Sequence, residues 1–232
     1  MSTSVDILVF GAHADDAEIG MGGTIAKHTA AGKRVAICDL TQAEMSSNGT
    51  VELRKQEAAE AAAVLGVCSR TNLELPDRGL FITKSNIDAI VAEIRRNRPR
   101  VVFAPYWVDR HPDHIACSKL VEEAVFNAKL RRYMPELPAV QVEQLIYYYI
   151  NDIDQVSLIV DVSNYYAAKQ QSLLAYRSQF QASAADEDRV STPLTDQYIE
   201  RVESRDALLG QPRAWKYAEG FALKRPHAVQ LF

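Results

Sequence analysis

Histidine and aspartate residues gather in two short stretches of the sequence, residues 13–16 (HADD) and residues 111–114 (HPDH). Together they hold three of the five histidines in the chain, which is too many for chance placement in eight positions. A catalytic zinc site commonly has three protein ligands drawn from histidine and carboxylate, with one position left open for water. His13, Asp16 and His114 would supply such a set. The two stretches therefore predict a metal site.

The remaining residues of these stretches carry side chains that suit acid–base chemistry. Asp15 stands beside the ligand Asp16, so it could take a proton from the attacking water as a general base. His111 lies three residues before His114 and could either bind metal or donate to the oxyanion formed when a carbonyl is attacked. Asp113 could hold His111 in one tautomer and stabilise its imidazolium form.

Other interpretations of the same residues remain open. A single His–Asp pair at the end of a strand is more often a turn or a helix cap, but two such clusters are harder to explain in this way. A metal phosphoesterase could use the same side chains. Phosphoesterases often use two metals. One set of three ligands beside a free aspartate would hold a single metal, so this pattern does not favour a phosphoesterase. A non-catalytic module that kept the fold is disfavoured because all six candidate positions are filled by reactive side chains.

Short apolar runs precede both stretches and explain how they could meet. Such runs, with helical patterns between them, are typical of buried parallel strands. In an open α/β sheet the ligand crevice lies outside the carboxyl ends of the strands. We expect strands at residues 5–10, 35–40, 71–75, 101–104, 144–150, 158–162 and 217–223, and helices at 18–31, 50–65, 85–97, 115–128, 163–176 and 195–209. The sequence therefore predicts one α/β domain over residues 1–232, with a doubly wound, mostly parallel sheet flanked by helices.

Local signals mark several boundaries. Thr50 is expected to cap a helix that ends at Gly66, and Ser85 is expected to cap the next helix. The glycines of residues 20–23 (GMGG) do not match the G-x-G-x-x-G dinucleotide motif, so close packing of a helix against the sheet is the better explanation. Residues 181–191 are polar and without apolar period, which indicates a surface loop that could act as a lid.

The composition excludes several classes of function. The net charge of −4 and the lack of a dense basic block give no footprint for nucleic acid. No apolar run reaches the roughly 18 residues of a membrane-spanning helix, and the N-terminus does not resemble a signal peptide. Cys38, Cys68 and Cys117 are odd in number and widely spaced, which favours buried free thiols in a reducing compartment. We therefore expect a cytoplasmic protein that acts on a small molecule.

Residues 11–20 (GAHADDAEIG), with residues 110–114 (RHPDH) downstream, closely resemble the PIG-L/LmbE-like family of zinc-dependent N-acetylglucosamine deacetylases. In that family the first motif is usually His-Pro-Asp-Asp, and Ala14 here replaces the proline. The resemblance extends along most of the chain and includes residues 46–54 (SSNGTVELR), 76–79 (PDRG) and 217–221 (YAEGF). Those segments are similar to the branch that deacetylates N-acetylglucosaminyl-malate on the way to bacillithiol.

The resemblance implies a role for each residue already singled out. It implies a zinc site formed by His13, Asp16 and His114, a general base at Asp15, and a carbonyl-polarising pair formed by His111 and Asp113. It also implies a Rossmann-like fold, one Zn²⁺ per chain and a homo-oligomer, a hexamer in several family members. Fe²⁺ could serve in the cell, because zinc loading on purification follows affinity rather than use.

The resemblance further implies an N-acetylglucosamine substrate with an acidic aglycone, for which malate is the first candidate. A carboxylate in a cleft needs a cation, because leaving it unpaired is costly. The resemblance suggests Arg54 for this contact, and Arg110 is a second candidate; the alternative for Arg54 is a solvated helix residue. Ser47, in a polar loop after a strand, could add a hydroxyl contact. Another N-acetyl amino sugar or a chitooligosaccharide is the alternative substrate.

Overall fold

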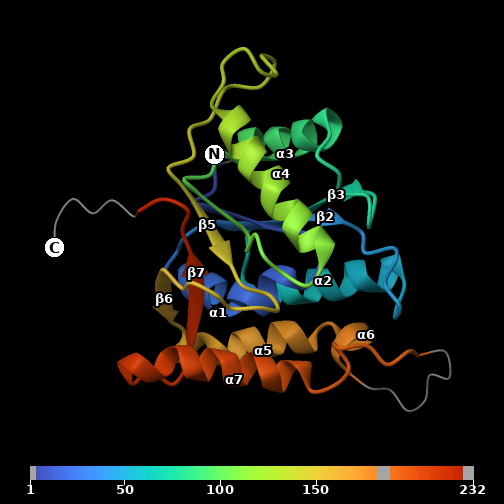
Figure 1. Cartoon of the computed structure of the whole chain (residues 1–232), viewed down its shortest axis with the longest axis vertical. Coiled ribbons are helices and arrows are strands. Elements are labelled where there is room, and N and C mark those ends of the chain that lie inside the picture. The colour runs from blue at the N-terminus through green and yellow to red at the C-terminus, as the bar shows by residue number, and fades with distance from the viewer. Residues whose placement is uncertain (1–3, 182–188, 227–232) are drawn as a thin grey trace.

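The strands of the computed structural model, which describes residues 4–181 and 189–226, form one sheet (Figure 1). Within those residues, seven strands lie in the order β3-β2-β1-β4-β5-β7-β6. They are β1 (Ile7–Gly11), β2 (Val35–Thr41), β3 (Ser69–Leu75), β4 (Val101–Pro105), β5 (Gln144–Tyr148), β6 (Leu158–Asp161) and β7 (Ala218–Ala222). Strands β1 to β5 pair in parallel, whereas β7 runs antiparallel to β5 and β6. The predicted doubly wound, mostly parallel sheet is confirmed.

Helices cover both faces of this sheet, as the apolar character of its central strands requires. The helices are α1 (Asp16–Ala30), α2 (Val51–Leu65), α3 (Lys84–Asn97), α4 (Pro112–Ala128), α5 (Tyr166–Leu174), α6 (Arg177–Phe180) and α7 (Tyr198–Gly210). Figure 1 shows α3 and α4 on one face and α1 and α2 on the other, with α5 packed against α1 and α2, while α7 packs against β7 and β6. Each face has its own apolar core. No helix in the described part of the chain is both long and apolar enough to cross a bilayer.

The strand order brings the two His/Asp stretches together. β1 lies between β2 and β4, so the chain first winds outward through β2 and β3 and then crosses back to β4 on the other side. The loops after β1 and β4 therefore leave the same edge of the sheet as neighbours, and their helices pack on opposite faces. A crevice at such a reversal point is where open α/β sheets bind their ligands.

The helix boundaries agree with the sequence signals in α2 and differ in α3. The hydroxyl of Thr50 accepts from the backbone N–H of Leu53, and Gly66 ends the helix with a left-handed φ of 68°, as predicted. The predicted cap at Ser85 is wrong. Thr83 caps α3, because its extended backbone lets its hydroxyl accept from the N–H of Asn86, and Ser85 falls inside the first turn.

Three further predictions have different outcomes in the structure. The predicted helix over residues 163–176 is divided into a 3₁₀ turn (Ser163–Tyr165) and α5. Cys38 and Cys117 are buried, but Cys68 is exposed, because it lies in the turn between α2 and β3 rather than in the core. Residues 182–188 of the expected surface loop lie outside the described residues, so its role as a lid stays a prediction.

Close packing explains the glycines of α1, as predicted. A Cβ atom on Gly20 would lie 2.1 Å from Cδ2 of Tyr148, and one on Gly23 would lie 2.8 Å from Cβ of Val162. The Tyr148 ring cannot easily give way, because its hydroxyl donates to the carbonyl oxygen of Phe10 at 2.7 Å. The part of α1 that carries these glycines therefore lies close against Tyr148 and Val162, with no room for a Cβ atom.

We expect Gly20→Ala to lower the free energy of unfolding by about 1–3 kcal/mol or more, the usual range for overpacking a dense core. Gly22→Ala is the matched control in the same helix, because its Cβ would lie 3.2 Å from Cγ of Lys169, which needs a shift of only a few tenths of an ångström, whereas the Cβ on Gly20 would overlap the ring. Denaturant unfolding measures both. Equal stability of the two variants would contradict this explanation of Gly20.

A break in α1 lies immediately after this contact. Met21 has non-helical torsion angles, φ −150° and ψ 23°, so the following N–H groups lack partners within the helix. The carboxylate of Glu219, in β7, accepts from the N–H groups of Gly23 at 2.9 Å and Thr24 at 2.6 Å. Lys169 is fully buried and donates to the same carboxylate at 2.7 Å. The last strand thus caps the second half of the first helix.

Candidate active site

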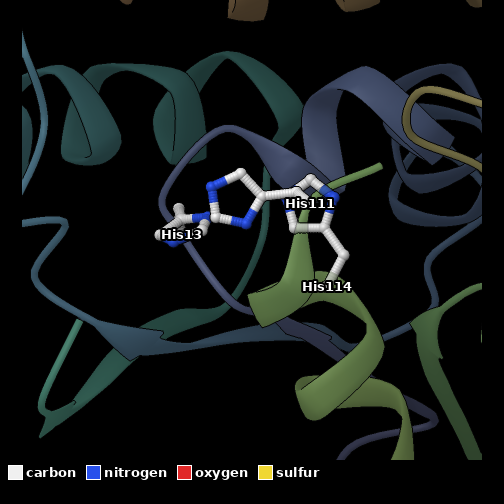
Figure 2. A group of neighbouring side chains, drawn as sticks. All are labelled: His13, His111 and His114. Atoms are coloured by element: carbon white, nitrogen blue, oxygen red, sulfur yellow. The ribbon is translucent and has the colours of Figure 1, made fainter. Parts of the chain in front are cut away.

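Three histidine rings meet at the edge of the sheet between β1 and β4 (Figure 2). His13 comes from the loop after β1, His111 caps α4, and His114 lies in the first turn of α4. One nitrogen of each ring lies within 4.8 Å of the others. His111 and His114 stack with their ring centroids 4.7 Å apart, and His13 meets His111 edge-on at 4.8 Å. The structure therefore brings the two predicted stretches together.

Asp16 lies between two of these rings. Its Oδ1 is 3.2 Å from Nε2 of His114, and its Oδ2 is 3.8 Å from Nδ1 of His13. The backbone N–H groups of Ala12 and His13 donate to Oδ2 at 2.8 and 3.0 Å, so Oδ1 is the freer oxygen. The three residues predicted as metal ligands thus lie together, with Asp16 facing His114 through Oδ1 and His13 through Oδ2.

The outward nitrogens of the two candidate ligand rings are each held by a carboxylate. Nε2 of His13 lies 3.3 Å from Oδ1 of Asp77, and Nδ1 of His114 lies 3.0 Å from Oδ1 of Asp109. A metal-binding histidine usually donates its second ring N–H to a carboxylate, which fixes the tautomer and leaves the other nitrogen as a lone pair. The contacts of His13 and His114 therefore suit metal binding. Sequence reasoning missed both Asp77 and Asp109, although each follows a strand.

The electrostatics of the site call for a cation. Burial alone would lower the pKa of His13, but the carboxylates of Asp113 and Asp77 outweigh it and raise that pKa to about 10. Burial is likewise outweighed at His114, where Asp16 and Asp109 raise the pKa to about 9. Both rings thus sit in an excess of buried negative charge. A divalent metal would neutralise that charge, and a histidine and carboxylate donor set fits zinc.

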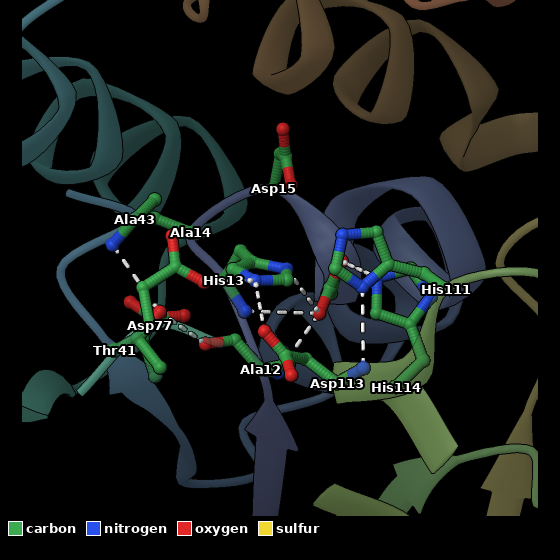
Figure 3. Close-up of polar contacts among 12 residues, drawn as sticks. Ala12, His13, Ala14, Asp15, Thr41, Ala43, Asp77, His111, Asp113 and His114 are labelled. Atoms are coloured by element: carbon green, nitrogen blue, oxygen red, sulfur yellow. Dashed lines mark hydrogen bonds and ion pairs between the residues drawn. The ribbon is translucent and has the colours of Figure 1, made fainter. Parts of the chain in front are cut away.

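Asp15 lies next to this cluster in a strained conformation. Its φ of 129° lies in a region that non-glycine residues rarely adopt and that is enriched at active sites. Figure 3 shows its side chain directed away from His13 and Asp113. The guanidinium of Arg54 donates to its Oδ2 at 3.1 Å and also to the carbonyl oxygen of Ala14. Burial raises the pKa of Asp15 to about 6 even though Arg54 opposes it, a value suited to a general base.

The predicted substrate contacts are spread around the site. Arg54 is only 4% exposed, so it is not a solvated helix residue, and its contacts are with the Asp15 loop. Arg110 and Ser47 are both exposed. The loop that carries Ser47 is held at the next residue, since the Asn48 side chain exchanges two hydrogen bonds with the backbone of Val190 at 2.8 and 2.9 Å.

The predicted pairing of Asp113 with His111 differs from the observed contacts. The Asp113 carboxylate accepts from the backbone N–H of Arg78 at 3.0 Å and from its guanidinium at 2.9 Å, and it lies 3.5 Å from Nε2 of His13. Arg78 reaches it because its left-handed φ of 59° turns the N–H toward α4. His111 instead accepts from the backbone N–H of Asp113, at 3.2 Å, through Nδ1.

This contact leaves His111 ready to donate. Burial and the neighbouring His114 and His13 rings lower its pKa, which favours the neutral ring. Because Nδ1 accepts a hydrogen bond, the proton of the neutral ring lies on Nε2. His111 can therefore serve as a neutral hydrogen-bond donor to a developing oxyanion without a carboxylate partner.

A cavity of about 860 Å³ lies beside the second motif, but its lining includes none of His13, Asp15, Asp16, His111 and His114. It lies between α7 and the loop after β5, with Arg110 at its edge and Asn151 and Tyr198 in its wall. This volume would accommodate a sugar with a substituent.

Comparisons with known proteins find chains of similar sequence and fold. Residues 8–125 match the PIG-L family, described as GlcNAc-PI de-N-acetylase. The chain is 32% identical over 189 residues to a diacetylchitobiose deacetylase of Thermococcus kodakarensis, covering 75% of this chain and 70% of that protein. The crystal structure of the conserved protein TT1542 from Thermus thermophilus superposes with a TM-score of 0.89, at 38% identity over 97% of both chains. An N,N′-diacetylchitobiose deacetylase from Pyrococcus horikoshii shares the fold, with a TM-score of 0.80 at 23% identity over 94% of this chain and 82% of that one.

Proposed function

The chain belongs to the PIG-L family of GlcNAc-PI de-N-acetylases, and on that basis we propose that it is a metal-dependent deacetylase of N-acetylated amino sugars. The observation that carries this proposal is the set of facing atoms on His13, Asp16 and His114, with a buried carboxylate behind each ring. Release of acetate from N-acetylglucosamine derivatives by the metal-loaded protein tests it directly. Absence of acetate with every derivative would overturn the proposal.

Each residue of the site has a distinct part in the proposed reaction. His13, Asp16 and His114 would hold a divalent cation, which when bound polarises the acetyl carbonyl and makes the attacking water more acidic. Asp15 takes a proton from that water, and Nε2–H of His111 donates to the oxyanion of the tetrahedral intermediate. Asp15 then returns the proton to the leaving nitrogen, and the C–N bond breaks to give acetate and the free amino sugar. The Asp15 carboxylate is paired with Arg54. To act as the base, it must either leave this ion pair or accept the proton from a water molecule on the side of the loop where Arg54 lies.

One metal per chain fits the site better than two. His13, Asp77 and Asp113 form a second group of possible ligands on the opposite side of the His13 ring. A neutral imidazole binds metal through one nitrogen only and carries its proton on the other. His13 therefore serves one site at a time, and its Nε2–H is better explained as a donor to these carboxylates. This argues against a two-metal phosphoesterase, and elemental analysis of metal per chain tests it.

Finer assignments follow from the family resemblance. We propose Zn²⁺ as the bound metal, with Fe²⁺ possible in the cell, and a homo-oligomeric, cytoplasmic enzyme that could be a hexamer. For the substrate we propose N-acetylglucosaminyl-malate, which would place the enzyme in bacillithiol synthesis. A chitooligosaccharide is the alternative, favoured by the named activity of the Thermococcus relative.

Arg110 is the better cation for an acidic aglycone than Arg54. Arg54 is buried and occupied by Asp15 and Ala14, whereas Arg110 is exposed, precedes His111 directly and borders the large cavity. Wild type should therefore prefer the malate glycoside over plain N-acetylglucosamine in kcat/KM. One charge-assisted bond corresponds to roughly 10- to 150-fold, from about 1.5–3 kcal/mol.

Arg110→Ala should lose far more activity on the malate glycoside than on the plain sugar. The matched control is Arg100→Ala, an exposed arginine at the amino end of β4, whose side chain pairs with Glu143 at the opposite edge of the sheet. Steady-state rates on the malate glycoside, plain N-acetylglucosamine and diacetylchitobiose provide the measurement. Equal wild-type activity on the three compounds would remove the acidic aglycone and leave the general deacetylase.

A further inference from the structure

Asp109, in the loop between β4 and α4, has more polar contacts than a helix-capping residue needs. Its Oδ1 accepts from Nδ1 of His114 at 3.0 Å, from the backbone N–H of His111 at 2.8 Å and from the side-chain amide of Asn151 at 2.8 Å. Its Oδ2 accepts from the backbone N–H of Asn151 at 3.2 Å. The side chain is only 3% exposed. One buried carboxylate thus connects the candidate ligand His114, the candidate donor His111 and the loop after β5.

The contacts extend one residue further. Tyr198, near the start of α7, donates its hydroxyl to Oδ1 of Asn151 at 3.0 Å, which orients the amide so that its NH₂ group faces Asp109. The backbone N–H and the side chain of Asn151 then hold both oxygens of Asp109. The Asp109 carboxylate therefore cannot rotate without breaking contacts with two different loops.

A carboxylate in this position determines which nitrogen of His114 carries the proton. Because Nδ1–H donates to Asp109, Nε2 is the nitrogen that would give up its proton to a metal, and Nε2 is the atom that faces Asp16 at 3.2 Å. Donation to a carboxylate also makes the ring a stronger base, and loss of such a partner commonly weakens metal binding 10- to 100-fold.

We propose that Asp109, held in place by Asn151 and Tyr198, is a positioning residue that sets the affinity of this site for its metal by fixing the tautomer and orientation of His114. The proposal rests on the proposed metal site and adds to it a chain of residues that reaches α7. The loss of metal affinity on substitution should therefore be largest at Asp109, smaller at Asn151 and smallest at Tyr198. A residue with a merely structural role would lower stability without that order in affinity.

The test measures Zn²⁺ affinity of the whole apoprotein by competition with a chromogenic chelator. Asp109→Asn should bind Zn²⁺ about 10- to 100-fold more weakly than wild type. Asn151→Ala should lose about 2- to 10-fold, the equivalent of one hydrogen bond, and Tyr198→Phe should lose least. Asp154→Asn is the matched control, an exposed carboxylate in the loop that carries Asn151, whose partner is the hydroxyl of Tyr106.

A second readout follows the proton itself. The Nδ1–H of His114 should give a hydrogen-bonded imidazole signal in proton NMR of the wild type and of Asp154→Asn, and that signal should shift or exchange away in Asp109→Asn. If Asp109→Asn fails to fold, Asn151→Ala decides the matter by the same two measurements.

The outcomes separate this inference from the proposed function. Tight Zn²⁺ binding by wild type, with unchanged affinity in Asp109→Asn and Asn151→Ala, would overturn the positioning role and leave the metal site intact. Absence of Zn²⁺ binding by wild type would overturn the metal site itself. A graded loss with an unchanged Asp154→Asn control would support both.

Discussion

Asp15→Asn is expected to lower kcat by about 10²-fold or more while the protein keeps its full metal content. Asparagine has nearly the shape of aspartate but cannot accept a proton, so the variant removes the proposed general base. It also removes the negative charge that faces the buried Arg54 guanidinium, while its amide oxygen can still accept from Arg54. Asparagine also tolerates positive φ about as well as aspartate does. The strained backbone at this position, φ 129°, should therefore survive the substitution. Steady-state kinetics with elemental analysis of the same sample provide the measurement.

Comparison with His111→Ala makes this result specific. That variant should lose kcat by about 10²–10³-fold if His111 donates to the oxyanion, again with metal retained. Near wild-type turnover in Asp15→Asn would show that the base lies elsewhere. Loss of metal in His111→Ala would show that His111 is a ligand, which its place beside His13 and His114 allows geometrically.

His114→Ala should lose the metal and with it nearly all activity, because two remaining protein ligands do not make a catalytic zinc site. The fold should persist, since His114 belongs to neither apolar core. His28→Ala is the matched control: this histidine lies in α1, and its Nδ1 contacts the carbonyl oxygen of Thr24 at 2.8 Å. Metal content after dialysis and thermal unfolding of both variants would be compared. Full metal retention in His114→Ala would reject the ligand assignment.

The sequence could predict that the two His/Asp stretches meet, because the strands that precede them can be recognised from their apolar residues. The apolar run before His13 and the one before His111 are each followed by a short loop that carries reactive side chains. Parallel strands in one sheet put their carboxyl ends at one edge, so the meeting of these side chains follows from the fold class alone. The glycines of α1 could be interpreted for a similar reason, since a helix packed against a sheet needs small residues at the contact.

Residues that act through a partner could not be predicted in this way. Asp77 and Asp109 are separated along the chain from at least one of the groups they contact, and a lone aspartate after a strand is too common to indicate a role. For Asp113 the sequence predicted a wrong partner. Asp113 is close to His111 in the sequence, but its carboxylate accepts hydrogen bonds from Arg78 instead, because the left-handed backbone of Arg78 turns its N–H toward α4. Side-chain partners depend on local backbone torsions, which spacing does not reveal.

Arg54 illustrates how burial changes the role expected of a residue. From the sequence it is a cation in the first turn of a helix, open to a substrate carboxylate. In the structure the turn faces inward, and the guanidinium meets the Asp15 loop. A partner that belongs to the protein itself occupies the position where an acidic ligand was expected.

The cap that Glu219 places on α1 affects the order in which this protein can mature during synthesis. Gly23 is synthesised 196 residues before Glu219, which accepts its N–H in the folded protein. Until then the second half of the helix that begins at Asp16 lacks its cap, and β6 has no neighbour, because β7 lies between it and β5. The second half of α1 and strand β6 can therefore reach their final packing only after β7 has been synthesised.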